Sequence, residues 1–201
     1  MMKLARLALA ALLLAPAAAS AQQDTIVIRA GTILDGKGGV LRDTAIVVQG
    51  SKIVRIDPKA VGTVTYDLKT VTVMPGWIDT HAHIASHFDR ATGRLHSNQS
   101  PPETIEEQTM YLVENAYNIL MSGFTTVQSP GSEIDKYLRA WTAENRVPGP
   151  RILTSLRSVT ENTGTPAQIR EFVRKAVADG ADFDVIVVMA SIGSWPPSLT
   201  R

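Results

Sequence analysis

The most informative absence in this 201-residue sequence is that of cysteine. Without a thiol the chain can form no disulfide, no cysteine nucleophile and no thiolate metal site. Any bound metal must therefore be held by histidine, carboxylate or modified lysine. An excess of charge of either sign is also lacking, since 20 Lys and Arg side chains stand against 19 Asp and Glu side chains. This balance gives no electrostatic reason to expect nucleic acid or an anionic membrane surface as a partner.

Long apolar runs are lacking too, apart from one short run near the N-terminus. Leu7–Ala15 is uninterrupted apolar sequence of nine residues, preceded by Lys3 and Arg6. A membrane-spanning helix needs about 20 such residues. A basic start, a short apolar run and the small residues Ala19-Ser20-Ala21 are the three parts of a secretory signal peptide. We therefore predict a signal peptide over residues 1–21, a secreted or periplasmic product and no stable membrane insertion.

Residues 22–70 predict a small β-sheet module. Ile26 and Ile28 alternate with their neighbours, Thr44–Val48 is a second β-forming run, and Gln49–Lys52 has the composition of a hairpin turn. The glycines at positions 36, 38 and 39 are turn residues, because no helix opens directly after them to cradle a phosphate.

Residues 71–201 predict alternating strands and helices, which is typical of a parallel α/β sheet or barrel. Apolar runs place the strands at Val71–Met74, Phe124–Val127, Ile152–Leu156 and Val185–Met189. The intervening segments have amphipathic helical patterns. Capping signals predict that one helix begins after Ser100, with Glu103 in its first turn, and that another begins after Thr165.

The chemistry concentrates in the string Asp79-Thr80-His81-Ala82-His83, which follows the first of these apolar runs. Residues two apart on a strand share a face, so both imidazoles can reach one metal ion. Asp79 has the same parity and could accept a hydrogen bond that orients an imidazole. The position also fits, because parallel barrels place their active sites at the C-terminal ends of the strands. The spacing alone leaves open a chance pair of histidines on a polar strand end.

Other candidate residues carry weaker signals. His87 and His96 lie in the polar stretch after the motif and could approach a metal or substrate, but the pattern favours solvated loop histidines. Trp77 and Trp141 are interpreted as packing residues rather than substrate platforms.

In its setting the His-x-His motif resembles the first-strand signature of the amidohydrolase superfamily. The resemblance continues through Gly123–Val127, Val147–Ile152 and Ala178–Asp182. It is greatest for the group with imidazolonepropionase-like and Xaa-Pro dipeptidase-like members. The resemblance implies an α/β chain with a small N-terminal β-sheet module followed by a (β/α)8 TIM-like barrel. It also implies hydrolysis of C–N bonds in amide or dipeptide-like small molecules with one or two divalent metal ions, commonly zinc.

The sequence departs from the family pattern in two ways. Family members supply a bridging carboxylated lysine or glutamate from the fourth strand, where this sequence has Val187, and Asp184 has the opposite parity. They supply further histidines and an aspartate from later strands. A full barrel takes about 250 residues, so we expect residues 71–201 to form only its first half, about four strand–helix units.

Two functions stay open at this point. The first is a metal-dependent hydrolase of C–N bonds that uses His81 and His83 as metal ligands, truncated in this chain. The second is a non-catalytic truncated product, or a half-barrel that needs a partner chain. In either case we expect the chain alone to be inactive and to oligomerise through the open edges of its sheet.

Overall fold

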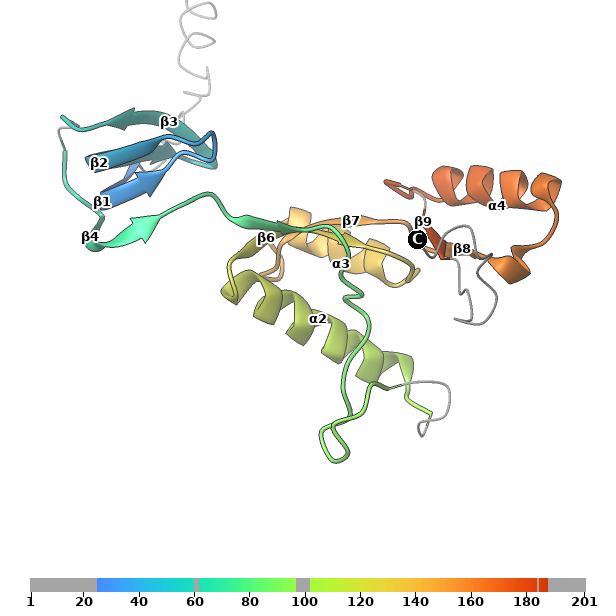
Figure 1. Ribbon diagram of the computed structural model, residues 1–201. Helices are drawn as coiled ribbons and strands as arrows, with labels where there is room; N and C mark the ends of the chain where they lie inside the picture. Colours follow the sequence, from blue (N-terminus) through green and yellow to red (C-terminus); the bar gives the residue numbers. More distant parts are fainter. Residues whose placement is uncertain (1–24, 60–61, 97–101, 184, 188–201) are drawn as a thin grey trace, which may run out of the picture. The chain divides into compact units, whose positions relative to one another are not determined.

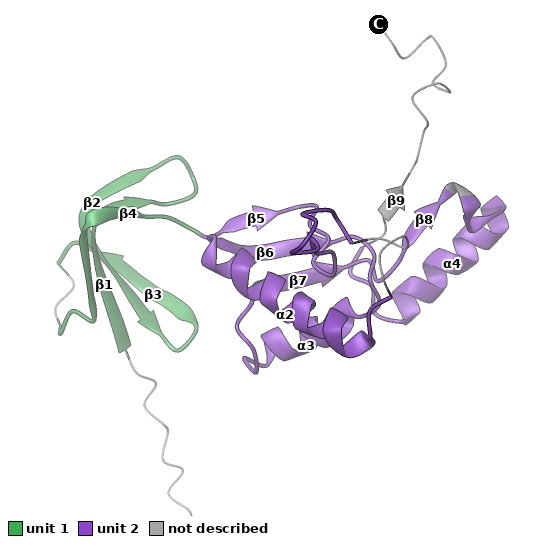
Figure 2. Cartoon of the chain, turned by 90° about the horizontal axis from the view of Figure 1, so that it is seen from below, with its two compact units in different colours: residues 1–75 green, residues 76–201 purple. Residues whose placement is uncertain are grey.

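The computed structural model describes residues 25–59, 62–96, 102–183 and 185–187. The chain falls into two compact units, Met1–Pro75 and Gly76–Arg201 (Figure 2). The predicted signal peptide lies outside the described residues, so its cleavage and the export of the protein stay predictions. Among the helices that are described, none has the length and apolar character needed to cross a membrane.

The first unit contains a four-stranded sheet in the order β3-β2-β1-β4 (Figure 1). β1 (Thr25–Leu34), β2 (Val40–Gln49) and β3 (Lys52–Asp57) are antiparallel neighbours, whereas β4 (Tyr66–Val73) runs parallel to β1. β1 and β2 bury a small apolar cluster of Ala30, Ile33 and Ile46, and the register of β1 against β4 shifts between Ala30 and Thr32. The prediction of a small N-terminal β-sheet is therefore confirmed.

The turn between β1 and β2 is closed by the side chain of Asp35. Its Oδ1 accepts the backbone N–H groups of Lys37 and Gly39 at 2.7 and 2.8 Å. These two hydrogen bonds hold the pKa of Asp35 below its usual value. Gly36 and Gly38 have positive φ angles of 71° and 94°, which explains the glycines in this turn.

One predicted strand belongs to a different sheet. Val71–Met74 was expected to be the first barrel strand, but Thr72 and Val73 pair with β1 in the first unit. The first strand of the second unit is instead β5 (Trp77–Asp79). Pro75 and Gly76 separate the two strands. Proline has no N–H to extend a ladder, and a Cβ on Gly76 would collide with the side chain of Thr125.

The second unit is built on a parallel sheet in the order β5-β6-β7. β6 (Phe124–Ser129) and β7 (Arg151–Thr154) follow β5, and α2 (Ile105–Met121) and α3 (Asp135–Ala143) form the crossovers. Helices and sheet share one core of buried side chains: Ile84, Leu112, Ala116, Val127, Leu138 and Ile152. This confirms the predicted parallel β/α arrangement for the three strands of this sheet.

The start of α2 differs from the prediction by one helical turn. The helix begins after Thr104, whose hydroxyl accepts the N–H of Glu107, while the Glu107 carboxylate accepts the N–H of Thr104. Ser100, the predicted cap, lies outside the described residues. The sequence contains the same Ser/Thr-x-x-Glu signature twice in a row, and a helix can start at only one of them.

The last described elements are α4 (Pro166–Ala178), the short 3-10 helix η2 (Glu161–Thr163) and two short strands. α4 begins after Thr165 as predicted, with a capping box to Gln168. β9 (Val185–Val187) pairs in parallel with β8 (Ser158–Thr160), a strand that the sequence did not predict. In the part of the chain that is described, β9 therefore lies in a two-stranded sheet and not beside β7. Asp184 and Met189 lie outside this part.

The two predicted packing tryptophans are largely exposed. Trp77 is 54% exposed and meets the ring of Phe124 edge-on, and Trp141 is 44% exposed with the guanidinium of Arg146 4.1 Å from its ring centroid. Both rings therefore pack against a neighbouring side chain at the surface, and neither lies in the core.

Candidate active site

The His-x-His motif lies immediately after β5, at the carboxyl end of the parallel sheet. The chain continues alongside β6 beyond Asp79, because the N–H of Ala82 donates to the carbonyl oxygen of Gln128 at 2.9 Å. Ile84 is 1% exposed and anchors the segment in the core. Ala82 and Ile84 face inward. His81, which precedes Ala82, and His83, which lies between Ala82 and Ile84, are therefore turned to the surface, where both are exposed.

The structure brings the two predicted imidazoles together. The ring centroids of His81 and His83 are 5.2 Å apart with an interplanar angle of 76°. Asp79 Oδ1 accepts the backbone N–H of His81 at 2.9 Å, so this carboxylate positions the main chain of the motif. The donor set fits a divalent ion of the zinc class, which imidazole nitrogen binds well.

A buried carboxyl group that the sequence did not reveal lies at the ends of β6 and β7. Asp135, the first residue of α3, is fully buried, and Thr154 Oγ1 donates to its Oδ2 at 3.2 Å. Burial raises the pKa of Asp135, while hydrogen bonds from Ser129 and Thr154 and the charge of His83 oppose the rise. A lone acid at the start of a helix is common, so its sequence carries no signal of this burial.

His87, His96 and Glu103 form a second polar cluster, referred to below as the His87 cluster. His87 is 8% exposed, and its Nε2 lies 2.8 Å from Glu103 Oε1. His96 Nδ1 lies 3.2 Å from the same oxygen. The prediction of a solvated loop histidine is therefore wrong for His87.

The segment between β5 and α2 folds inward because α2 holds its backbone. Asn115 Nδ2 donates to the carbonyl oxygens of Ile84 and Ser86, both at 2.8 Å. The ring of Tyr111, one helical turn earlier, stacks on His87 at 3.7 Å. Polar side chains on α2 thus bury a loop whose own sequence reads as exposed, and no local pattern could have predicted it.

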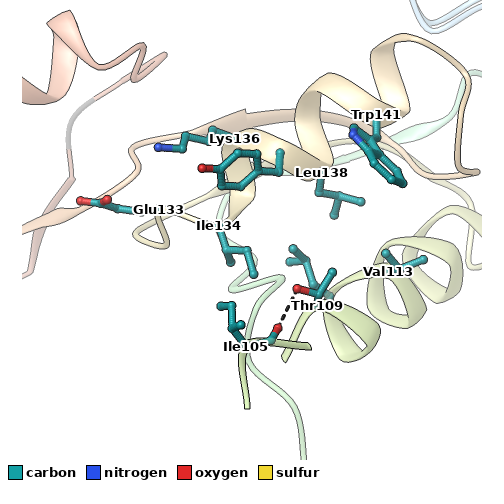
Figure 3. A pocket seen from close by; sticks show the side chains of 10 residues that line it. Ile105, Thr109, Val113, Glu133, Ile134, Lys136, Leu138 and Trp141 are labelled. Carbon is teal, nitrogen blue, oxygen red and sulfur yellow. Dashed lines mark hydrogen bonds between the residues drawn. The ribbon is translucent and has the colours of Figure 1, made fainter. Parts of the chain in front are cut away.

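An apolar cavity of about 510 Å³ opens between α2 and α3, with its lining drawn in Figure 3. Ile105, Leu112, Ile134 and Trp141 contribute to this lining, but none of the four histidines does. The cavity is therefore not the candidate active site.

Comparison with known proteins decides the family of this chain. Residues 72–198 match the model of the amidohydrolase family. The chain belongs to the amidohydrolase family. The predicted resemblance is therefore confirmed, and amidohydrolases typically bind metal.

Individual amidohydrolases resemble the chain over part of their length. The imidazolonepropionase of Micrococcus luteus is 38% identical over 63 residues, which are 30% of this chain and 16% of that protein. The crystal structure of a Xaa-Pro dipeptidase with methionine bound in the active site is 26% identical, with a TM-score of 0.68 over 80% of this chain and 46% of that one. A prolidase complexed with N-methylphosphonate-L-proline has 22% identity and a TM-score of 0.62, covering 84% and 47% of the two chains. The chain thus spans less than half the length of these amidohydrolases.

Proposed function

We propose that this amidohydrolase is a metal-dependent hydrolase of C–N bonds in small amide or dipeptide-like molecules. The observation that carries the proposal is the pair of exposed imidazoles, His81 and His83, at the carboxyl end of β5. That edge of a parallel β/α sheet is where barrel enzymes assemble their active sites. We propose these two histidines as ligands of a divalent ion, zinc in the first instance.

Each residue of the motif has a distinct task in this proposal. His81 and His83 present neutral ring nitrogens to the ion, and their exposure leaves room for a substrate beside them. Asp79 holds the main chain of His81 through its 2.9 Å hydrogen bond, and Ile84 ties the other end of the motif to the core. A divalent ion bound there would lower the pKa of a water molecule and polarise the scissile carbonyl group.

The substrate class follows from the family and from the Xaa-Pro dipeptidase, whose active site accommodates methionine. In the proposed reaction water adds across the C–N bond, with its hydroxyl going to the carbonyl carbon and its proton to the leaving nitrogen. This chain spans 46% of the length of that dipeptidase. The activity is therefore proposed for the full-length natural protein and not for the 201 residues taken alone.

The test is a zinc-dependent assay of dipeptide hydrolysis. The protein at its natural length is stripped with a chelator, resupplied with zinc and assayed for release of free proline from a panel of Xaa-Pro dipeptides. We expect His81→Ala and His83→Ala each to lower kcat/KM by about 100-fold or more, since loss of even a group that only supports a metal ligand costs 10–100-fold. Arg94→Ala, an exposed change in the following segment, is the matched control and should retain activity. Zinc-dependent hydrolysis that survives both histidine substitutions would sink the proposal.

A further inference from the structure

We infer that the His87 cluster is a second metal site, separate from His81 and His83, for a divalent ion of the zinc class. His87, His96 and Glu103 each offer one ligand atom, and these three atoms lie within 4.8 Å of one another. The proposed ion is structural. It would tie the segment that follows His81 and His83 to the approach of α2.

The Glu103 oxygen lies slightly closer to the two imidazole nitrogens than the ligands of a bound zinc ion lie to one another. Glu103 Oε1 lies 2.8 Å from His87 Nε2 and 3.2 Å from His96 Nδ1. Zinc bonds of about 2.0–2.2 Å place neighbouring tetrahedral ligands roughly 3.3 Å apart. Side-chain shifts of a few tenths of an ångström would therefore bring the two distances from Glu103 Oε1 to the spacing of zinc ligands.

The charge and burial of Glu103 argue for a cation. Its side chain is 15% exposed, beside His87 at 7% and His96 at 20%. Glu103 Oε2 is buried and has no hydrogen-bond partner in the described structure. A buried carboxylate oxygen without a partner is costly, and a bound cation would remove that cost.

The alternative is a metal-free network in which both imidazoles donate to Glu103. That network occupies Oε1, which lies 2.8 Å from His87 Nε2 and 3.2 Å from His96 Nδ1, but it leaves Oε2 buried and unsatisfied. A cation accounts for both oxygens, because a carboxylate can offer either oxygen or both to a metal. The unsatisfied oxygen is therefore the observation that separates the two explanations.

The ligand side chains are held in place before any ion binds. The ring centroid of His87 lies 3.7 Å from that of Tyr111 and 4.9 Å from that of His96, and both pairs of rings are stacked. The backbone N–H of His96 donates to the carbonyl oxygen of His87 at 2.9 Å. Such fixed rotamers are what a metal site needs to bind without a large loss of conformational entropy.

The donor set selects the class of ion. Two imidazole nitrogens and a carboxylate match the ligands that zinc prefers, whereas magnesium and calcium prefer oxygen ligands throughout. With Glu103 binding through both oxygens, the cluster would supply four ligand atoms and leave no open position for water, as expected of a structural ion.

The test is a zinc titration by calorimetry on the whole chain carrying His81→Ala and His83→Ala. This background lacks the pair proposed for catalysis, so we expect the one zinc ion that it binds to occupy the His87 cluster. Adding Glu103→Gln removes the charge but keeps the shape, and should weaken binding by about 100-fold or more, because a ligand matters at least as much as the groups that support ligands. Glu106→Gln, an exposed acid in the first turn of α2, is the matched control and should leave the affinity unchanged.

A second readout is the melting temperature of the same variants. Saturating zinc should raise the melting temperature of the background and of the Glu106→Gln control but not that of Glu103→Gln, because only folded protein presents the three ligands together. His96→Gln changes the more exposed ligand and is the substitute if Glu103→Gln does not fold. The inference is overturned if the background binds no zinc, or if Glu103→Gln binds zinc as well as its parent. Zinc bound at the His87 cluster, together with no zinc-dependent hydrolysis by the protein that keeps His81 and His83, would support this inference and contradict the proposed function.

Discussion

Two pairs of histidines occupy one segment of this amidohydrolase, and they have opposite surroundings. His81 and His83 are exposed beside the end of β5, held by the main chain on either side. His87 is buried, and with the partly buried His96 it shares the carboxylate of Glu103. His81, the first histidine of one pair, and His87, the first of the other, are only six positions apart.

The comparison distinguishes histidines that are available to a metal or substrate from a histidine that stabilises the fold. An exposed imidazole keeps its nitrogens in contact with water and can exchange that water for a metal or substrate at little cost to the fold. A buried imidazole must have partners within the protein, so its removal is felt by the whole unit. The same residue type therefore serves two purposes, and substitutions should distinguish them.

The largest effect on stability is expected from His87. His87→Ala removes the hydrogen bond to Glu103 and the stack on Tyr111, and should lower the free energy of unfolding by about 2 kcal/mol. His83→Ala removes an exposed side chain and should change it by less than about 0.5 kcal/mol. Urea denaturation in the presence of a chelator measures both without a contribution from metal. Equal losses in the two variants would contradict the contrast in burial.

A smaller effect is expected from the cap of α2. Thr104→Ala should cost about 1 kcal/mol, and so should Thr165→Ala, because each removes one capping hydroxyl. Only Thr104 is adjacent to Glu103, so only its substitution should shift the NMR signals of the His87 ring. A shift of equal size in Thr165→Ala would show that the His87 cluster does not depend on the start of α2.

The smallest effect is a change in pH dependence at Asp135. Burial raises the pKa of Asp135 in the folded protein above 3.8, the ordinary value of an aspartate, so the folded state binds this proton more tightly than the unfolded chain. The resulting stabilisation is present below 3.8 and is lost as the pH rises through the raised folded pKa. Asp135→Asn cannot titrate, so its stability relative to the parent should increase with pH across this window. Denaturation midpoints at a series of pH values measure the difference, and a constant difference would contradict the shift.

His83, one of the exposed pair, should influence the pH dependence of stability that Asp135 causes. The charge of His83 lowers the pKa of Asp135, so His83→Ala should widen the window in which the parent loses stability. The same denaturation series in this background is the check. A window that stays the same would show that the two groups do not interact.

Local signals predicted those elements whose cause is local. The capping signal at Thr165 predicted the start of α4, because a capping box acts within a few residues. The same reasoning placed the start of α2 at Ser100 instead of Thr104, because the same capping signature occurs twice in succession and the sequence does not distinguish the two. It also assigned Val71–Met74 to the barrel, because an apolar run does not reveal which sheet it joins.

The sequence by itself determined which two residues form the exposed pair. His81 and His83 are two residues apart just after a strand, and where the chain runs alongside β6 this spacing brings their rings together. Only the tertiary structure decided the His87 cluster and Asp135. Their contacts span 16 residues between His87 and Glu103, and 19 between Asp135 and Thr154. Such contacts form only after α2 and α3 have packed on the sheet, because burial is set by the partners that surround a side chain and not by its neighbours along the chain.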